Sequence, residues 1–190
     1  MYKISVLYLL LVITLLFFET SGCNKKPDVQ YQNFTDKKDF SWKQELTLSD
    51  IPDIPVKGYL NGKEVSFTYI VLERWRGSND NDIIFSLVKP SQQCGYIENY
   101  HGFRLVNKGN RIEQGVWSKP KFEDDTKAYQ CYYVYKSADG NSVRSNVNWN
   151  CVLKIDSESN KDVSGMIAIC FEDTAKSWIA GRFDAAICNN

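Results

Sequence analysis

A histidine and a cysteine that lie close together in the sequence are the residues of this chain best suited to nucleophilic chemistry. Cys94 precedes His101 by seven positions, and His101 is the only histidine among 190 residues. A nucleophile that relies on an imidazole base would have to use His101, and the spacing allows a Cys94–His101 dyad. A surface histidine and a disulfide cysteine explain the same residues without catalysis, and we favour this interpretation. One histidine also excludes a metal site with several histidine ligands.

Acidic residues form the second group with possible chemistry. They cluster at residues 79–82, at residues 123–125, and at Asp156 with Glu158. Oxygen ligands at alternate positions suit calcium, and two carboxylates at a fixed separation could hydrolyse a glycosidic bond. The first cluster lacks the glycine and the distant glutamate of an EF-hand loop. We interpret all three clusters as charged turns between strands, and we predict no metal and no cofactor.

The elements that must position these residues are predicted to be strands. From residue 55 onward, apolar and polar residues alternate with a period of two, and β-branched and aromatic residues are enriched. Asn61-Gly62 is a strong hairpin signal, and no window after residue 22 has the 3.6-residue period of a helix. The predicted strands cover residues 57–60, 65–69, 83–88, 103–106, 112–117, 129–135, 149–155, 165–171 and 178–188.

These strands predict an all-β protein with a single folded domain at residues 55–190. Short strands at regular spacing, with turn residues between them, indicate one antiparallel β-sandwich, and a small β-barrel is the alternative. Residues 165–171 are apolar on both faces, which is typical of a central strand covered on both sides. The many aromatic side chains, 14% of the residues, would mainly fill this core.

The cysteines predict disulfide bonds. The expected domain contains the five possible disulfide cysteines Cys94, Cys131, Cys151, Cys170 and Cys188. Two hairpins would bring either Cys131 and Cys151 or Cys151 and Cys170 opposite each other, and these two pairings exclude one another. Cys94 and Cys188 border polar stretches, and they could join the C-terminus to a loop. No C-x-x-C spacing occurs, so neither a zinc ribbon nor a thioredoxin-like redox site is supported.

The first residues of the chain have the pattern of an export signal. A lysine at position 3 is followed by an apolar run from residue 4 to residue 18 and then by small residues up to Cys23. A basic start, about fifteen apolar residues and a small-residue cleavage point are typical of a secretory signal peptide. The run is shorter than the roughly twenty apolar residues of a transmembrane helix. We therefore predict a signal peptide at residues 1–22.

The end of this leader resembles the lipobox of bacterial lipoproteins. Thr20-Ser21-Gly22-Cys23 places small residues before a cysteine, although the family usually has Leu where this chain has Thr20. The resemblance implies that Cys23 is acylated and becomes the first residue of the mature protein. Residues 23–54 would then form the lipidated N-terminus and a polar tether. If Cys23 carries lipid, five cysteines remain, and at least one of them must lack a disulfide partner.

The composition restricts the function. Twenty-three basic and twenty-three acidic residues give a formal net charge of zero, which argues against nucleic-acid binding. We expect an envelope lipoprotein, held to the cell membrane on the exported side, with a non-catalytic binding or structural domain. Its partner would be the membrane, and beyond that an envelope protein or a glycan. Asn24 is not the Asp that retains enterobacterial lipoproteins at the inner membrane, which favours the outer membrane where the host has one.

Three other functions fit the sequence, and one of them is a calcium- or glycan-binding surface protein. The chain could be a freely secreted β protein with three disulfides, in which case Cys23 is unmodified and no thiol is free. It could also be an anchored hydrolase that uses a pair of carboxylates in a cleft.

Overall fold

The computed structural model describes residues 40–74, 80–95, 101–109, 112–126 and 129–189. The chain divides into two compact units, residues 1–34 and 35–190, and all described residues belong to the second. The predicted signal peptide (1–22), the lipidation residue Cys23 and the first part of the expected tether lie outside the described residues. No helix in the described part of the chain is both long and apolar enough to cross a membrane.

Strands dominate the described residues, so the predicted all-β class is confirmed. The one helical element among these residues is the 3₁₀ turn η1, Leu48–Asp50. The eleven strands are β1 (Lys57–Leu60), β2 (Lys63–Ser66), β3 (Tyr69–Arg74), β4 (Asn81–Ser86), β5 (Gly102–Asn107), β6 (Gly115–Lys119), β7 (Tyr129–Lys136), β8 (Ser142–Ser145), β9 (Trp149–Glu158), β10 (Asp162–Phe171) and β11 (Trp178–Asn189).

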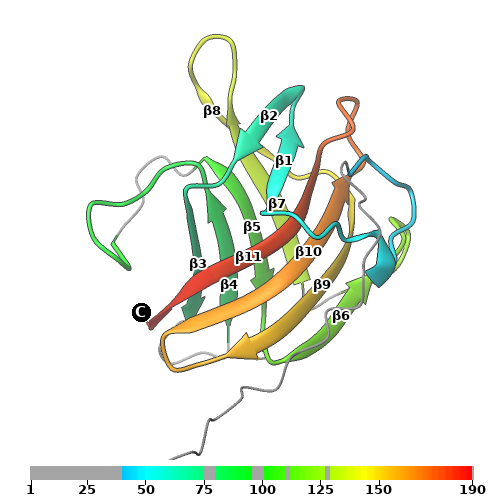
Figure 1. Cartoon of the computed structure of the whole chain (residues 1–190). Coiled ribbons are helices and arrows are strands. Elements are labelled where there is room, and N and C mark those ends of the chain that lie inside the picture. The colour runs from blue at the N-terminus through cyan, green and yellow to red at the C-terminus, as the bar shows by residue number, and fades with distance from the viewer. Residues whose placement is uncertain (1–39, 75–79, 96–100, 110–111, 127–128, 190) are drawn as a thin grey trace, which may run out of the picture. The chain divides into compact units, whose positions relative to one another are not determined.

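Hydrogen bonds join all these strands into one mixed sheet (Figure 1). Its order is β6-β9-β10-β11-β3-β4-β5-β7-β8, and the β1–β2 hairpin joins it through β11. The expectation of purely antiparallel pairing fails at two places: Pro55 forms an isolated parallel bridge with Arg182, and β11 runs parallel to β3. These two strands are distant in sequence, so no hairpin turn constrains them to be antiparallel.

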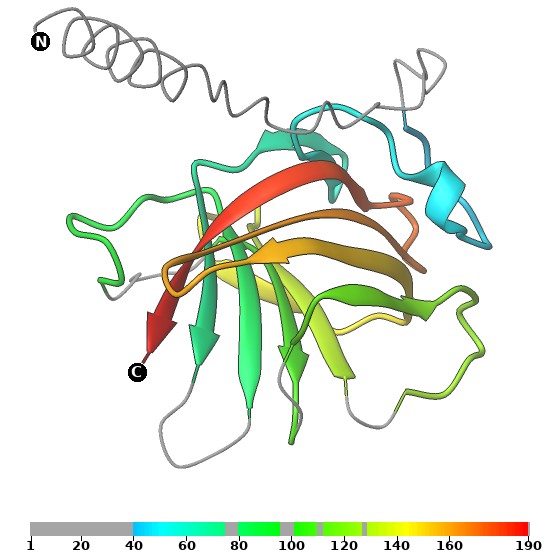
Figure 2. The same cartoon turned by 60° about the horizontal axis from the view of Figure 1, so that its bottom comes forward.

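The sheet curls into a half-barrel, so that its two sides face each other across a core (Figure 2). Strands β9, β10 and β11 form one side, and β3, β4, β5 and β7 form the other. Aromatic side chains from both sides fill the space between them: Phe85 contacts Phe103 and Phe183, with ring centroids 5.4 and 5.2 Å apart. This core shares the two facing layers of a sandwich and the continuous curl of a barrel.

Residues 40–54 belong to the folded domain, although we expected residues 23–54 to be a polar tether. Phe40, Leu46 and Ile51 are buried, and they pack against Ala168 and Cys170 on the outer face of β10. The indole Nε1 of Trp42 also donates a hydrogen bond of 2.7 Å to the carbonyl oxygen of Phe171. The physical reason is that β10 is apolar on both faces, as predicted, and its outer face needs a cover.

Local turn chemistry explains some strand boundaries and fails at others. Asn61 and Gly62 have φ values of 48° and 80° and join β1 to β2, as the hairpin signal predicted. The predicted strand at residues 65–69 is divided, because β2 ends at Ser66 and β3 begins at Tyr69. The expected charged turn at residues 79–82 is wrong in its second half, since Asn81 and Asp82 are buried within β4.

Candidate functional site

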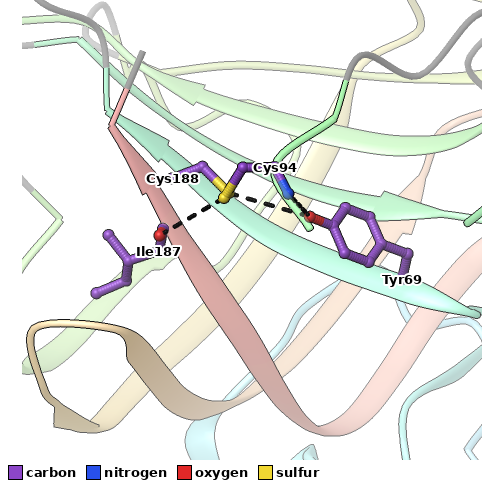
Figure 3. The surroundings of a disulfide bond; sticks show 4 residues. All are labelled: Tyr69, Cys94, Ile187 and Cys188. Atoms are coloured by element: carbon purple, nitrogen blue, oxygen red, sulfur yellow. Dashed lines mark hydrogen bonds between the residues drawn. A yellow bond between two sulfur atoms is a disulfide. The ribbon is translucent and has the colours of Figure 1, made fainter. Parts of the chain in front are cut away.

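The disulfide between Cys94 and Cys188 fixes the loop after β4 to the end of β11 (Figure 3). Tyr69 supports it from β3, because its hydroxyl accepts a hydrogen bond of 2.9 Å from the backbone N–H of Cys94. This confirms the predicted link between the C-terminus and a loop. Our interpretation of Cys94 as a disulfide cysteine is also confirmed, and the alternative Cys94–His101 dyad is excluded because its sulfur is bonded to Cys188.

The other three cysteines of the domain, Cys131, Cys151 and Cys170, are buried and free. The two hairpin pairings predicted for them are therefore wrong. Cys151 lies opposite Ile169 on β10, so Cys170 points to the other face of the sheet. Cys131 is on β7, which pairs with β5 and β8 and not with β9, where Cys151 lies.

None of these thiols is suited to act as a nucleophile near neutral pH. Burial raises the pKa of Cys131 and of Cys151 well above the ordinary value of a thiol. Burial also raises the pKa of Cys170 to about 12. A thiolate is the reactive form, so the three groups are protonated and serve as small apolar side chains of the core.

The acidic residues of the described segments are engaged mainly by nearby cations and backbone amides. Asp82 accepts a hydrogen bond of 3.0 Å from Nε of Arg104, which also reaches Glu73 on the next strand. From the other two clusters, Asp124 accepts from the backbone N–H of Lys121, and Asp156 pairs with Lys154. Within the described residues, no group of three or more His, Cys, Asp and Glu side chains could hold a metal ion.

Lys119 is a buried amine with a structural explanation. Its Nζ donates hydrogen bonds to the carbonyl oxygens of Lys121, Phe122 and Trp149, at 2.9, 2.6 and 2.7 Å. Burial lowers the pKa of this amine, and nearby acidic residues oppose that effect. Because three carbonyl oxygens accept its three protons, Lys119 closes the loop between β6 and β7 and has no donor left for a ligand.

The feature best suited to binding is an apolar cavity of about 280 Å³ beneath the β1–β2 hairpin. Its wall comes from three parts of the sheet: the hairpin, the two ends of the β4–β5 connection, and the end of β7. The lining residues are Leu60, Asn61, Lys63, Val65, Leu87, Val88, His101, Val134, Tyr135 and Lys136. Cavities with mostly apolar walls and a few polar groups are the usual form of small-molecule sites.

His101 is the polar side chain buried in this wall. It is 9% exposed, so the expectation of a surface histidine is wrong. Neither Nδ1 nor Nε2 has a hydrogen-bond partner among the residues that the structure describes, although both atoms are buried. An imidazole always carries at least one N–H donor, and burying such a group without a partner costs free energy. A ligand in the cavity could supply the missing partner.

The strand geometry explains why His101 lies here. Its carbonyl oxygen accepts a hydrogen bond of 2.9 Å from the N–H of Leu87, which extends the pairing of β4 with β5. The next residue, Gly102, has φ +135°, and a Cβ atom there would lie 2.1 Å from the carbonyl oxygen of Phe85. Only glycine permits this close approach, so the backbone conformation that places His101 in the cavity wall requires Gly102.

The electrostatic surroundings of the cavity are positive. Burial lowers the pKa of His101, and the positive charge of Lys136 lowers it further. Lys63, on the hairpin, is the second cation of the wall. The imidazole is therefore neutral near pH 7, with one N–H donor and one acceptor nitrogen, while two ammonium groups border the same space.

The sequence pattern alone did not identify this cavity. His101 is the only histidine of the chain, but we expected it at the surface, because no local pattern relates it to residues on other strands. The hairpin residues Leu60 and Val65 are apolar residues of predicted strands, which is typical of ordinary core positions. A comparison of the chain with protein-family models, with curated proteins and with solved structures found no match.

Proposed function

We propose that this chain is an exported, lipid-anchored binding protein whose β domain takes up a small, largely apolar molecule in the cavity beneath the β1–β2 hairpin. The observation that carries the binding role is the buried His101 in the wall of an apolar space, because its two ring nitrogens have no partner among the described residues. A ligand with one hydrogen-bonding group in the pocket would supply a partner for one of the two ring nitrogens.

Two features support export and anchoring. The leader ends in the lipobox-like Thr20-Ser21-Gly22-Cys23, and acylation of Cys23 would attach the domain to the membrane. Disulfides form and persist in oxidising compartments, and the Cys94–Cys188 bond fits the exported side of a membrane. The zero net charge is consistent with a partner other than nucleic acid.

Binding can be tested with 1-octanol, a small neutral probe with an apolar chain and one hydroxyl. The full chain would be placed in lipid nanodiscs with labelled histidine, and His101 would give one set of ring signals in NMR spectra because it is the only histidine. We expect a saturable shift of these signals. A shift that rises linearly with octanol would reflect partition into lipid and would contradict the proposal.

Two exposed valines provide a matched control for the binding test. Val88 lines the cavity and is 43% exposed, whereas Val116 is 56% exposed on β6, outside the cavity. We expect Val88→Trp to reduce octanol binding and Val116→Trp to leave it unchanged, since both substitutions enlarge a surface side chain in the same way. Equal effects of the two variants would count against the cavity as the binding site.

The anchor can be tested by the intact mass of the expressed protein, denatured and alkylated without reduction. We expect a membrane-bound species that begins at acylated Cys23 and carries three alkylated thiols, because Cys131, Cys151 and Cys170 are free. Cys94 and Cys188 would remain in their disulfide. A soluble species without lipid and without free thiols would instead identify a freely secreted protein with three disulfides.

A further inference from the structure

The charges around the cavity restrict the chemistry of its ligand. Among the described residues, the lining contains Lys63 and Lys136 and no acidic side chain. On β2 the side chains alternate, so Lys63 and Val65 share the face toward the cavity and Glu64 lies on the other face. Both lysines are exposed, so their ammonium groups are available at the rim, above apolar walls.

Some exposed lysines of the domain have an acidic partner, whereas these two have none in the ion pairs of the described residues. Lys43 pairs with Asp50 and Lys154 pairs with Asp156. Among the ion pairs between described residues, none includes Lys63 or Lys136. Another hollow of the surface, around Arg182, contains Asp53 and Asp184 in its wall, and Asp53 pairs with the arginine. Within the described part of the chain, the cavity beneath the hairpin therefore combines apolar walls with positive charge that no acidic side chain of its lining balances.

We infer that the ligand is a small amphipathic carboxylate, with its apolar body in the cavity and its carboxylate at the Lys63–Lys136 rim, within reach of the N–H of His101. This inference rests on the proposed binding function and specifies its ligand class. A carboxylate accepts hydrogen bonds and carries the charge that the two ammonium groups lack. The cavity, about 280 Å³, holds the volume of roughly nine liquid waters, so the apolar body is short.

The inference can be tested by comparing octanoate with 1-octanol, which have the same chain length and differ in charge. With the full chain in nanodiscs and His101 signals as the readout, we expect octanoate to bind more tightly than octanol. The affinity for octanoate should fall as salt concentration rises, whereas the affinity for octanol should not. Equal affinities and equal salt responses would overturn the inference.

Substitution of the lysines separates this inference from the proposed function. We expect Lys63→Gln and Lys136→Gln each to weaken octanoate binding roughly two- to five-fold, and the double variant to weaken it about tenfold. Octanol binding should change by less than about twofold. Lys161→Gln removes the same charge from an exposed turn outside the cavity and should affect neither probe.

The outcomes identify which statement fails. If octanol and octanoate bind equally in every variant, the carboxylate class is wrong and the binding function stands. If neither probe binds saturably, and Val88→Trp behaves like the unsubstituted chain, the proposed function fails and the inference fails with it. Weaker octanoate binding in Lys161→Gln, to the same degree as in Lys136→Gln, would reveal a general charge effect and would also overturn the inference.

Discussion

Two successive layers of side chains on the inner face of β4, β5 and β7 differ, because one layer is filled and the other borders a cavity. Phe85, Phe103 and Tyr133 form one layer, because each lies opposite the next in the pairing of β4, β5 and β7. Two residues further along each strand are Leu87, His101 and Tyr135, which line the cavity. The first layer is closely filled, whereas the second leaves a space of about 280 Å³.

The difference lies in how each layer is covered. Phe171 lies over the first layer, with its ring centroid 6.1 Å from that of Phe103 and 4.9 Å from that of Tyr133. The hydroxyl of Tyr133 donates a hydrogen bond of 2.6 Å to Asp173, so its polar atom is also satisfied. Among the described residues, the short β1–β2 hairpin is what covers the second layer, and none of them is a partner for the ring nitrogens of His101. One layer therefore stabilises the fold, and the other is available for a ligand.

Gly102 lies at the junction between the two layers, and its substitution should have the largest effect. We expect Gly102→Ala to lower the free energy of unfolding by about 4 kcal/mol or more, because it combines φ +135° with a Cβ placed 2.1 Å from a backbone oxygen. Gly140→Ala is the matched control: Gly140 has φ +82° but open space around its Cβ, so about 1 kcal/mol should be lost. Urea unfolding measures both, and equal losses would show that the close approach is unimportant.

Truncation of one aromatic and one imidazole side chain tests the contrast between the layers. We expect Phe103→Ala to cost about 3 to 4 kcal/mol, because it leaves a cavity in a filled core. His101→Ala should cost less than about 1 kcal/mol, since it enlarges an existing cavity and removes an unsatisfied polar group. Similar losses in urea unfolding would mean that the second layer is as tightly packed as the first.

Removal of the disulfide tests what holds the wall of the second layer in place. The loop that joins Leu87 to His101 is cross-linked at Cys94 to β11, and the closed loop spans a sequence separation of 94 residues. We expect Cys94→Ala with Cys188→Ala to lower the free energy of unfolding by about 2 to 3 kcal/mol and to weaken octanol binding. Cys151→Ala, which removes a free thiol from the core, should leave octanol binding unchanged.

The smallest effect concerns the dependence of stability on pH. The pKa of His101 is lowered in the folded protein, so the unfolded state binds more protons over the range in which a histidine titrates. The contribution of neutral His101 is present above the unfolded pKa of about 6.5 and is lost as pH falls through that value toward the folded pKa. We expect stability to fall between about pH 7.5 and 5.5. His101→Phe should reduce this fall, and an unchanged profile would indicate that His101 is solvated.

The features that could be predicted from the sequence are those that depend on residues close to one another along the chain. Asn61-Gly62 predicted its hairpin because a type I′ turn needs two residues that tolerate positive φ. The alternation of β7 and the apolar run of β10 predicted strands because side-chain direction in a strand repeats every two residues. The link between Cys94 and Cys188 was one of the proposed pairs, since both border polar segments.

The features that sequence missed depend on strands that are distant in the chain. The parallel pairing of β3 with β11 has no local signal. The cover over β10 by residues 40–54 was missed because three apolar side chains among polar ones have no regular period. Asp82 was interpreted as part of a turn, because its partner Arg104 comes from a different strand.

The amino-acid sequence by itself therefore determined the strand content, the hairpin turn, the zero net charge and the pattern of the leader, because each is a local or summed property. Only the tertiary structure decided which cysteines form a disulfide bond and which remain free. It also placed His101 in the wall of a cavity that two lysines line as well. These contacts depend on the curl of the sheet. Because of the curl, an aromatic ring covers the inner layer that contains Phe103, whereas a hairpin lies over the layer that contains His101. That curl arises from the pairing of all eleven strands together.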